Sequence, residues 1–158
     1  MILYFLRHAH AVDAVGLSDE ERALNDKGNA QAEATAKLFK RLSPQIDLIY
    51  TSPRLRCRQT AEIVGRAVDR TPEVREELNF EFNLTLLNDL LAPLNFDQNV
   101  MLVGHEPTFS RAVHDLTGAR IEMKKCGIAR VDLISRTPLQ GELVWLVAPR
   151  LVRAIVER

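Results

Sequence analysis

The stretch MILYFLRHAH, residues 1–10, joins an apolar run to a polar turn that contains an arginine and two histidines. The run from Met1 to Leu6 has no charged residue and is rich in strand-forming side chains, so it predicts a buried β-strand. Continuous apolar strands are typical of parallel sheets that helices cover on both faces. Arg7, His8 and His10 follow this strand directly, which places polar chemistry at its carboxyl end.

Strand and helix patterns alternate along the rest of the chain. We expect strands at residues 46–51, 74–78, 100–103, 128–134 and 143–147, and helices at 26–42, 52–67, 84–91, 107–116 and from 149 to the end. Asn25 is expected to cap the first helix, and Ser52-Pro53 to start the second. The apolar face of the last helix is expected to comprise Leu151, Val152 and Ile155.

This order predicts an α/β fold with three layers. A mostly parallel sheet would lie between helices on both faces, and the hairpin of the last two strands would make the sheet mixed. The length of 158 residues fits one domain, so a single domain is expected over residues 1–158.

Composition excludes some classes of function. Lys and Arg together number 21, as do Asp and Glu, so the chain is formally neutral and does not resemble a protein that binds nucleic acid through bulk charge. Cys57 and Cys126 are too few for a disulfide framework and suit a reducing compartment. No run approaches the ~18 apolar residues of a membrane span, and no export signal is recognised, so we expect a cytoplasmic protein without membrane partners.

Histidine and arginine gather at the carboxyl ends of three expected strands. The first strand ends in Arg7-His8, the strand at 100–103 ends in Gly104-His105, and Arg56 lies on the first turns of the helix that follows the strand at 46–51. Ligands of open α/β sheets bind beyond the carboxyl ends of the strands. We therefore expect these side chains to meet at one edge of the sheet.

Two guanidinium groups and two imidazoles suit a phosphoryl group. The planar fork of an arginine pairs with two phosphate oxygens at once, and two forks neutralise the charge of the transition state for phosphoryl transfer. A neutral imidazole nitrogen is a competent nucleophile toward phosphorus, and nearby arginines disfavour its protonation.

Four blocks of sequence resemble the histidine phosphatase superfamily, and most closely its short SixA-type branch of phosphohistidine phosphatases. The blocks are LYFLRHAHA at 3–11, RALNDKG with QA at 22–32, TSP with RCRQTA at 51–61, and VGHEP at 103–107. The resemblance implies a phosphoglycerate-mutase-like fold and a phosphatase that needs no metal or other cofactor. Its substrate would be a phosphorylated molecule, such as a protein that carries phosphohistidine.

The same resemblance implies roles for individual residues. His8 would be the phosphorylated nucleophile, Arg7 and Arg56 would clamp the phosphate, and His105 would donate to a phosphoryl oxygen. Glu77, in the segment REEL at 75–78, is the candidate general acid. Arg54 receives no role, because it is expected to lie on another face of the helix.

Two other functions remain open from the residues alone. His8 and His10 form a His-x-His pair at a strand end, and with His105 and a carboxylate such as Asp13 they could hold Zn²⁺ in a metal-dependent hydrolase. A non-catalytic relative that binds phosphorylated proteins is the second alternative.

Overall fold

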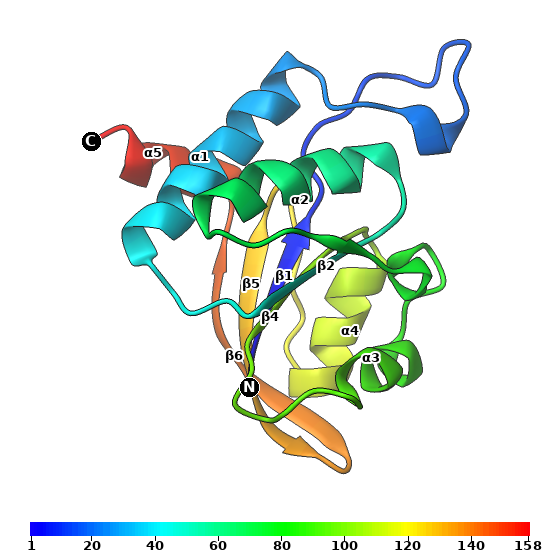
Figure 1. The fold of residues 1–158 in the computed structure, drawn as a ribbon, viewed down its shortest axis with the longest axis vertical. Helices are drawn as coiled ribbons and strands as arrows, with labels where there is room; N and C mark the ends of the chain where they lie inside the picture. The colour runs from blue at the N-terminus through cyan, green and yellow to red at the C-terminus, as the bar shows by residue number, and fades with distance from the viewer.

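The structure, a computed structural model, describes residues 1–158 and contains one six-stranded sheet (Figure 1). The strands are β1 (Ile2–Arg7), β2 (Leu48–Thr51), β3 (Glu73–Val74), β4 (Val100–Gly104), β5 (Ile128–Arg136) and β6 (Leu139–Val147). The helices are α1 (Asp26–Leu42), α2 (Leu55–Ala67), α3 (Leu84–Leu91), α4 (Thr108–Thr117) and α5 (Pro149–Val156). Two short 3₁₀ helices, η1 (Asp19–Glu21) and η2 (Glu76–Leu78), lie in the connections.

The order of strands in the sheet is β3-β2-β4-β1-β5-β6. Strands β3, β2, β4 and β1 run parallel, whereas β5 is antiparallel to both β1 and β6. Strand β4 lies between β1 and β2 and is parallel to both, so the carboxyl ends of these three strands are adjacent. In the register, Arg7 lies opposite Gly104, and Thr51 lies opposite Val103.

Helices cover both faces of the sheet. On one face, α1, α2 and α5 pack over Tyr4, Leu6 and Met101, and on the other α3 and α4 pack over Phe5 and Leu102 (Figure 1). Neighbouring residues of β1 thus enter different cores, which explains why this strand is apolar throughout. The predicted three-layer α/β fold with a mixed, mostly parallel sheet is confirmed.

The helix starts follow the local sequence with one exception. Asn25 caps α1, and its side chain accepts a hydrogen bond from the Gly28 amide, as predicted. Helix α2 begins at Leu55 rather than at Ser52-Pro53, because Arg54 retains an extended backbone conformation as its N-cap.

The apolar face predicted for α5 is wrong in part. Val152 and Val156 are buried, whereas Leu151 and Ile155 are exposed. Both pairs are spaced i, i+4, so each forms a row along the helix, and it is the row of Val152 that faces the core shared with α1. None of the helices is both long and apolar enough to span a membrane.

Candidate active site

Backbone hydrogen bonds bring three loops together at the carboxyl edge of the sheet. The amide of His8 donates to the Gly104 carbonyl over 3.0 Å, and the amide of Ser52 donates to the Val103 carbonyl over 2.9 Å. The loop before β5 joins them, because the amide of Cys126 donates to the His8 carbonyl over 3.0 Å. The segments after β1, β2 and β4 are therefore fixed to one another before any side chain is considered.

The imidazole of His8 is held in one tautomer. Its Nδ1 lies 2.8 Å from the carbonyl oxygen of Ala9. Because a carbonyl oxygen only accepts, Nδ1 carries the proton and Nε2 keeps a free lone pair. Arg56 Nε donates toward that lone pair at 3.4 Å, so the basic nitrogen of His8 faces the guanidinium of Arg56.

Burial keeps His8 neutral. The residue is only 7% exposed, and desolvation is the largest influence that lowers the pKa of its imidazole, to about 3. The bond to Ala9 acts in the opposite direction, while the charges of Arg56, Arg7 and Lys125 lower the pKa further. At neutral pH the ring is therefore uncharged although three cations lie near it, and a neutral imidazole of this kind is chemically able to act as a nucleophile.

His105 lies beside His8 and is also neutral. The two ring centroids are 5.4 Å apart, and His105 Nε2 lies 2.8 Å from the hydroxyl of Ser52. Burial, followed by the influence of His8 and Arg56, lowers the pKa of His105 to about 3. The ring of Phe80 covers it at 4.5 Å between centroids. His105 can thus offer a hydrogen bond to an anion without carrying a charge itself.

Asp19, which the sequence did not single out, organises the arginines. Its carboxylate accepts from Arg56 Nη2 at 3.0 Å and from Arg54 Nη1 at 2.8 Å, and its carbonyl accepts from Arg56 Nη1 at 2.8 Å. Arg22 binds the other carboxylate oxygen at 2.9 Å. Partial burial acts to raise the pKa of Asp19, but the hydrogen bonds and charges of these arginines outweigh it and lower the pKa to about 2.

The expectation that Arg54 lies on a different face from Arg56 is wrong. Both guanidinium groups converge on the same carboxylate oxygen of Asp19. Arg54 also stacks on Phe80, with its Cζ 4.2 Å from the ring centroid, and donates to Asn79 at 3.0 Å. The reason is the later start of α2, because an extended N-cap residue points its side chain elsewhere than a helical one does.

Arg7, the last residue of β1, is held by the loop that precedes β5. Its Nη1 donates to the carbonyl of Met123 at 2.8 Å, whereas its Nε is buried and has no partner. A buried donor without a partner costs about 1–3 kcal/mol, so this nitrogen gains from an anionic ligand. The structure thus places Arg7 next to His8 with a donor available.

Glu77 lies on η2 and pairs with its neighbour rather than with either histidine. Its carboxylate accepts from Arg75 Nη2 at 3.0 Å. A bond from its own backbone amide, followed by the bond from Arg75, lowers the pKa of Glu77 below its ordinary value. An ionised carboxylate has no proton to give, so the observed geometry does not favour the predicted role of general acid.

The histidines do not assemble a metal site. The Nδ1 of His10 lies 2.9 Å from the side-chain oxygen of Gln31, on the α1 side of the strand end. No group of three His, Cys, Asp or Glu side chains in the structure is arranged to hold a metal ion. The set of His8, His10, His105 and Asp13 proposed above as an alternative is therefore not brought together.

Cys57 on α2 is a buried neighbour of His105. Its Sγ lies 3.6 Å from His105 Nε2, and burial raises the pKa of its thiol to about 12. A thiol with this pKa is protonated at neutral pH and is a poor nucleophile. Cys57 therefore packs against His105 as a protonated thiol.

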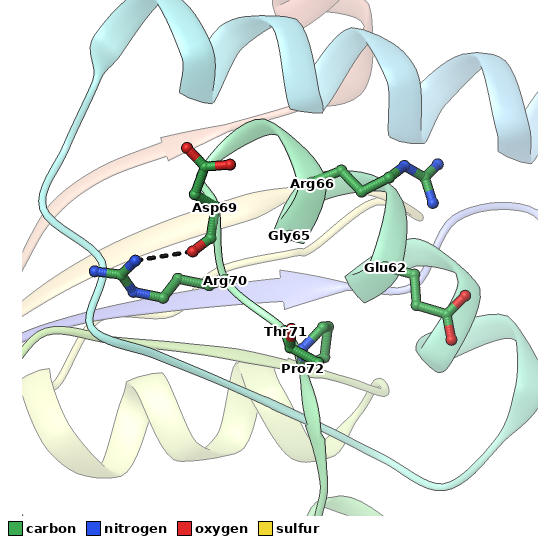
Figure 2. A pocket seen from close by; sticks show the side chains of 7 residues that line it. All are labelled: Glu62, Gly65, Arg66, Asp69, Arg70, Thr71 and Pro72. Carbon is green, nitrogen blue, oxygen red and sulfur yellow. Dashed lines mark hydrogen bonds between the residues drawn. The ribbon is translucent and has the colours of Figure 1, made fainter.

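A separate hollow at the far end of α2 lacks these groups. Figure 2 shows it between the last turn of α2 and the loop to β3, where Arg70 donates to the Asp69 carbonyl. Because α2 runs antiparallel to β2, this hollow lies at the amino edge of the sheet, away from His8. It contains no histidine, and its residues have no part in the arrangement described above.

Comparison with known proteins decides the family. The family model described as histidine phosphatase superfamily (branch 1) matches residues 3–91. The chain belongs to the histidine phosphatase superfamily. A relative from Picosynechococcus sp., itself uncharacterised, is 33% identical over 81% of this chain and 82% of its own length.

Solved structures place this histidine phosphatase in the SixA-type branch. It superposes on the protein histidine phosphatase SixA complexed with tungstate with a TM-score of 0.85 and 26% identity, over 96% of this chain and 99% of that one. The Agrobacterium tumefaciens protein assigned to the SixA phosphohistidine phosphatases gives a TM-score of 0.78 and 31% identity, over 94% and 98% of the two chains. Membership of this family supports phosphatase activity on a phosphorylated substrate.

Proposed function

We propose that this protein is a metal-independent phosphatase, formed by one domain over residues 1–158, that works through a phosphohistidine intermediate on His8. Its substrate is a phosphohistidine of a protein or another activated phosphate. The observation that carries the proposal is the neutral His8 imidazole, whose free Nε2 faces Arg56. The names of the SixA structures, both of which refer to phosphohistidine or protein histidine phosphatases, support the substrate class.

In the first step, His8 Nε2 attacks the phosphorus atom. A new N–P bond forms while the bond from phosphorus to the leaving group breaks and its electron pair departs with that group. Arg7 and Arg56 bind the equatorial oxygens, whose charge spreads most in the transition state. His105, held by Ser52, donates a further hydrogen bond to one of them. These guanidinium groups supply the positive charge that a metal ion supplies in other phosphatases.

In the second step, water attacks the phosphorus atom of phosphorylated His8. The N–P bond breaks, inorganic phosphate leaves, and the imidazole returns to its neutral form with the proton on Nδ1. The bond from Nδ1 to the Ala9 carbonyl persists through both steps and stabilises the positive charge that the ring gains while it is phosphorylated.

The ionisation of the nearby carboxylates bears on the leaving group. Asp19 and Glu77 both have a lowered pKa and hold arginines, so neither stores a proton for an alkoxide. An alkyl phosphate needs such a proton, whereas an imidazole leaving from a labile N–P bond needs less help. The geometry therefore favours phosphoramidates and other activated phosphates over ordinary phosphate esters.

The intermediate is tested by rapid-quench labelling. Enzyme mixed with radiolabelled phosphoramidate is quenched in alkali, where phosphohistidine survives, and the label is mapped by mass spectrometry. We expect label on His8, none in His8→Asn, and unchanged labelling in His10→Asn. Label on His10 or His105, or none in an enzyme that turns over, contradicts the mechanism. Activity that is lost in EDTA and restored by Zn²⁺ supports the metal-dependent alternative instead.

A further inference from the structure

A groove in which seven of the sixteen lining residues are lysine or arginine begins at Arg7 and follows α1. Its walls are α1, α5 and the loop that precedes β5, and it encloses about 870 Å³. Helices α1 and α5 lie side by side (Figure 1). Arg41 of α1 fixes this arrangement, because its guanidinium donates to the carbonyls of Ile155 and Val156 at 2.8 and 2.9 Å. The relative position of the two helices that form the groove is therefore fixed by hydrogen bonds between them.

Positive charge dominates this groove in a chain that is neutral overall. Seven cationic side chains and three carboxylates line it, whereas the whole chain has 21 of each sign. Besides Arg7, the cations are Lys27, Lys37, Lys124, Lys125, Arg150 and Arg153. Two of the carboxylates are already paired, in the ion pairs Lys124–Glu122 and Arg153–Glu157. The remaining cations face the groove without an ion-pair partner.

The groove adjoins the segment that carries His8, because Arg7 and His10 on either side of it both line the groove. Arg7, which immediately precedes His8, belongs to its wall, and Lys125 precedes the Cys126 amide that binds the His8 carbonyl. The start of α1 is pressed against the same strand end, since a Cβ on Gly28 would lie 1.9 Å from the His10 carbonyl oxygen. A substrate polypeptide that extends from His8 toward Arg7 would therefore reach this groove.

The length of the groove distinguishes between kinds of anion. Lys27 and Lys37 are ten residues apart on α1 and both line it, which corresponds to about 15 Å at 1.5 Å per residue. An extended polypeptide covers about 3.3 Å per residue, so four or five residues span this distance. A single phosphate would contact only one end. The spacing of the cations thus fits an acidic segment of polypeptide.

We propose that this groove binds an acidic segment that adjoins the phosphorylated residue of a substrate protein. The inference rests on the proposed function, whose substrate class it narrows to proteins with acidic residues beside the phosphorylated site. Because five of the seven cations are exposed, each of these contributes only modestly to binding. Their combined charge mainly raises the rate of encounter with an acidic partner, and this effect weakens as the salt concentration rises.

Binding is measured separately from turnover. Fluorescence anisotropy follows an unphosphorylated, fluorescein-labelled peptide of eight glutamates, with the eight-glutamine peptide as its control. We expect the acidic peptide alone to bind, and Lys27→Glu combined with Lys37→Glu to weaken binding about tenfold. The matched control, Lys40→Glu combined with Arg66→Glu, changes the net charge equally outside the groove and should bind as the wild type does. Equal weakening by both variants, or displacement of the peptide by equimolar inorganic phosphate, overturns the proposal.

Turnover is then compared on two peptides in which a central phosphohistidine is flanked by glutamates or by glutamines. We expect kcat/KM of the wild type to favour the acidic peptide about tenfold at low salt, and the groove variant to lose that preference. Equal rates on both peptides refute the groove while leaving the phosphatase mechanism intact. Failure to turn over either peptide, with the acidic peptide still bound, refutes the proposed substrate instead.

Discussion

Lowering the pH from 7 to 5 is expected to destabilise the fold through its two buried histidines. In the folded chain the pKa of His8 and that of His105 each lie at about 3, whereas an imidazole in the unfolded chain titrates near 6.5. Between these values the unfolded state binds more protons than the folded state, so the free energy of unfolding falls as the pH falls. Above about pH 6.5 both states are neutral and the full stability is present.

The magnitude follows from the width of this window. At pH 5 the solution is about 1.5 units below the unfolded pKa, and one unit corresponds to about 1.36 kcal/mol per group. Each histidine therefore costs about 2 kcal/mol, a large share of the roughly 5–15 kcal/mol that stabilises a domain. His8 is 7% exposed and His105 is 1% exposed, so solvent screens little of this effect. Asp19 stays ionised throughout, because its pKa lies at about 2.

Urea unfolding at pH 7, 6 and 5 measures the effect. We expect the free energy of unfolding of the wild type to fall by about 3–4 kcal/mol, and that of His8→Asn, which has lost one of the two titrating groups, to fall by about half as much. His114→Asn removes an exposed histidine from α4 and should leave the wild-type dependence in place. A wild type that is equally stable at pH 7 and pH 5, or a His8→Asn variant with the full dependence, would refute the reasoning.

Four single substitutions separate the components of the site. Arg56→Ala should lower kcat by about 10²–10³ while KM changes less, since a preorganised donor contributes about 3 kcal/mol in the transition state. Steady-state measurement of kcat and KM for the variant and the wild type tests this. Asp19→Asn, which weakens the charge that orients Arg56, should lower kcat about tenfold, and an unchanged kcat would deny it a positioning role. Glu77→Gln should change turnover of p-nitrophenyl phosphate less than about threefold; a loss confined to alkyl phosphates would establish it as the general acid. Cys57→Ala should retain kcat and lose about 1 kcal/mol of stability, whereas an inactive, stable variant would indicate a thiol mechanism.

The convergence of the site could be predicted because it follows from strand ends. His8 and His105 each follow an apolar strand directly, and the rule for parallel sheets brings such positions to one edge. Neighbouring strands then fix the spacing, with Arg7 opposite Gly104 in the register. The prediction that His8 and His105 meet did not depend on the conformation of any irregular loop.

The role of Asp19 could not be predicted, because this residue lies in an irregular connection rather than at a strand end. It lies on a single 3₁₀ turn within the long connection from β1 to α1, where no periodicity indicates which side chain turns inward. Its position depends on contacts with distant residues, such as the bond from the Leu24 amide to Gln59 that ties this loop to α2. The expected position of Arg54 was wrong because the N-cap was expected at Ser52, two residues before the observed N-cap at Arg54. A side chain changes direction when its backbone changes from helical to extended.

The bond between His8 and the Ala9 carbonyl also fixes the regiochemistry of the intermediate. With Nδ1 committed as a donor, Nε2 is the one ring nitrogen that can accept a phosphoryl group, so the phosphorylated enzyme would be purely the τ isomer. Reagents that distinguish the two isomers of phosphohistidine would then report turnover of this enzyme through a single signal. A substrate protein that carries the π isomer would lose it to an enzyme nitrogen of the other kind, so each catalytic cycle would convert one positional isomer into the other before water removes the phosphate.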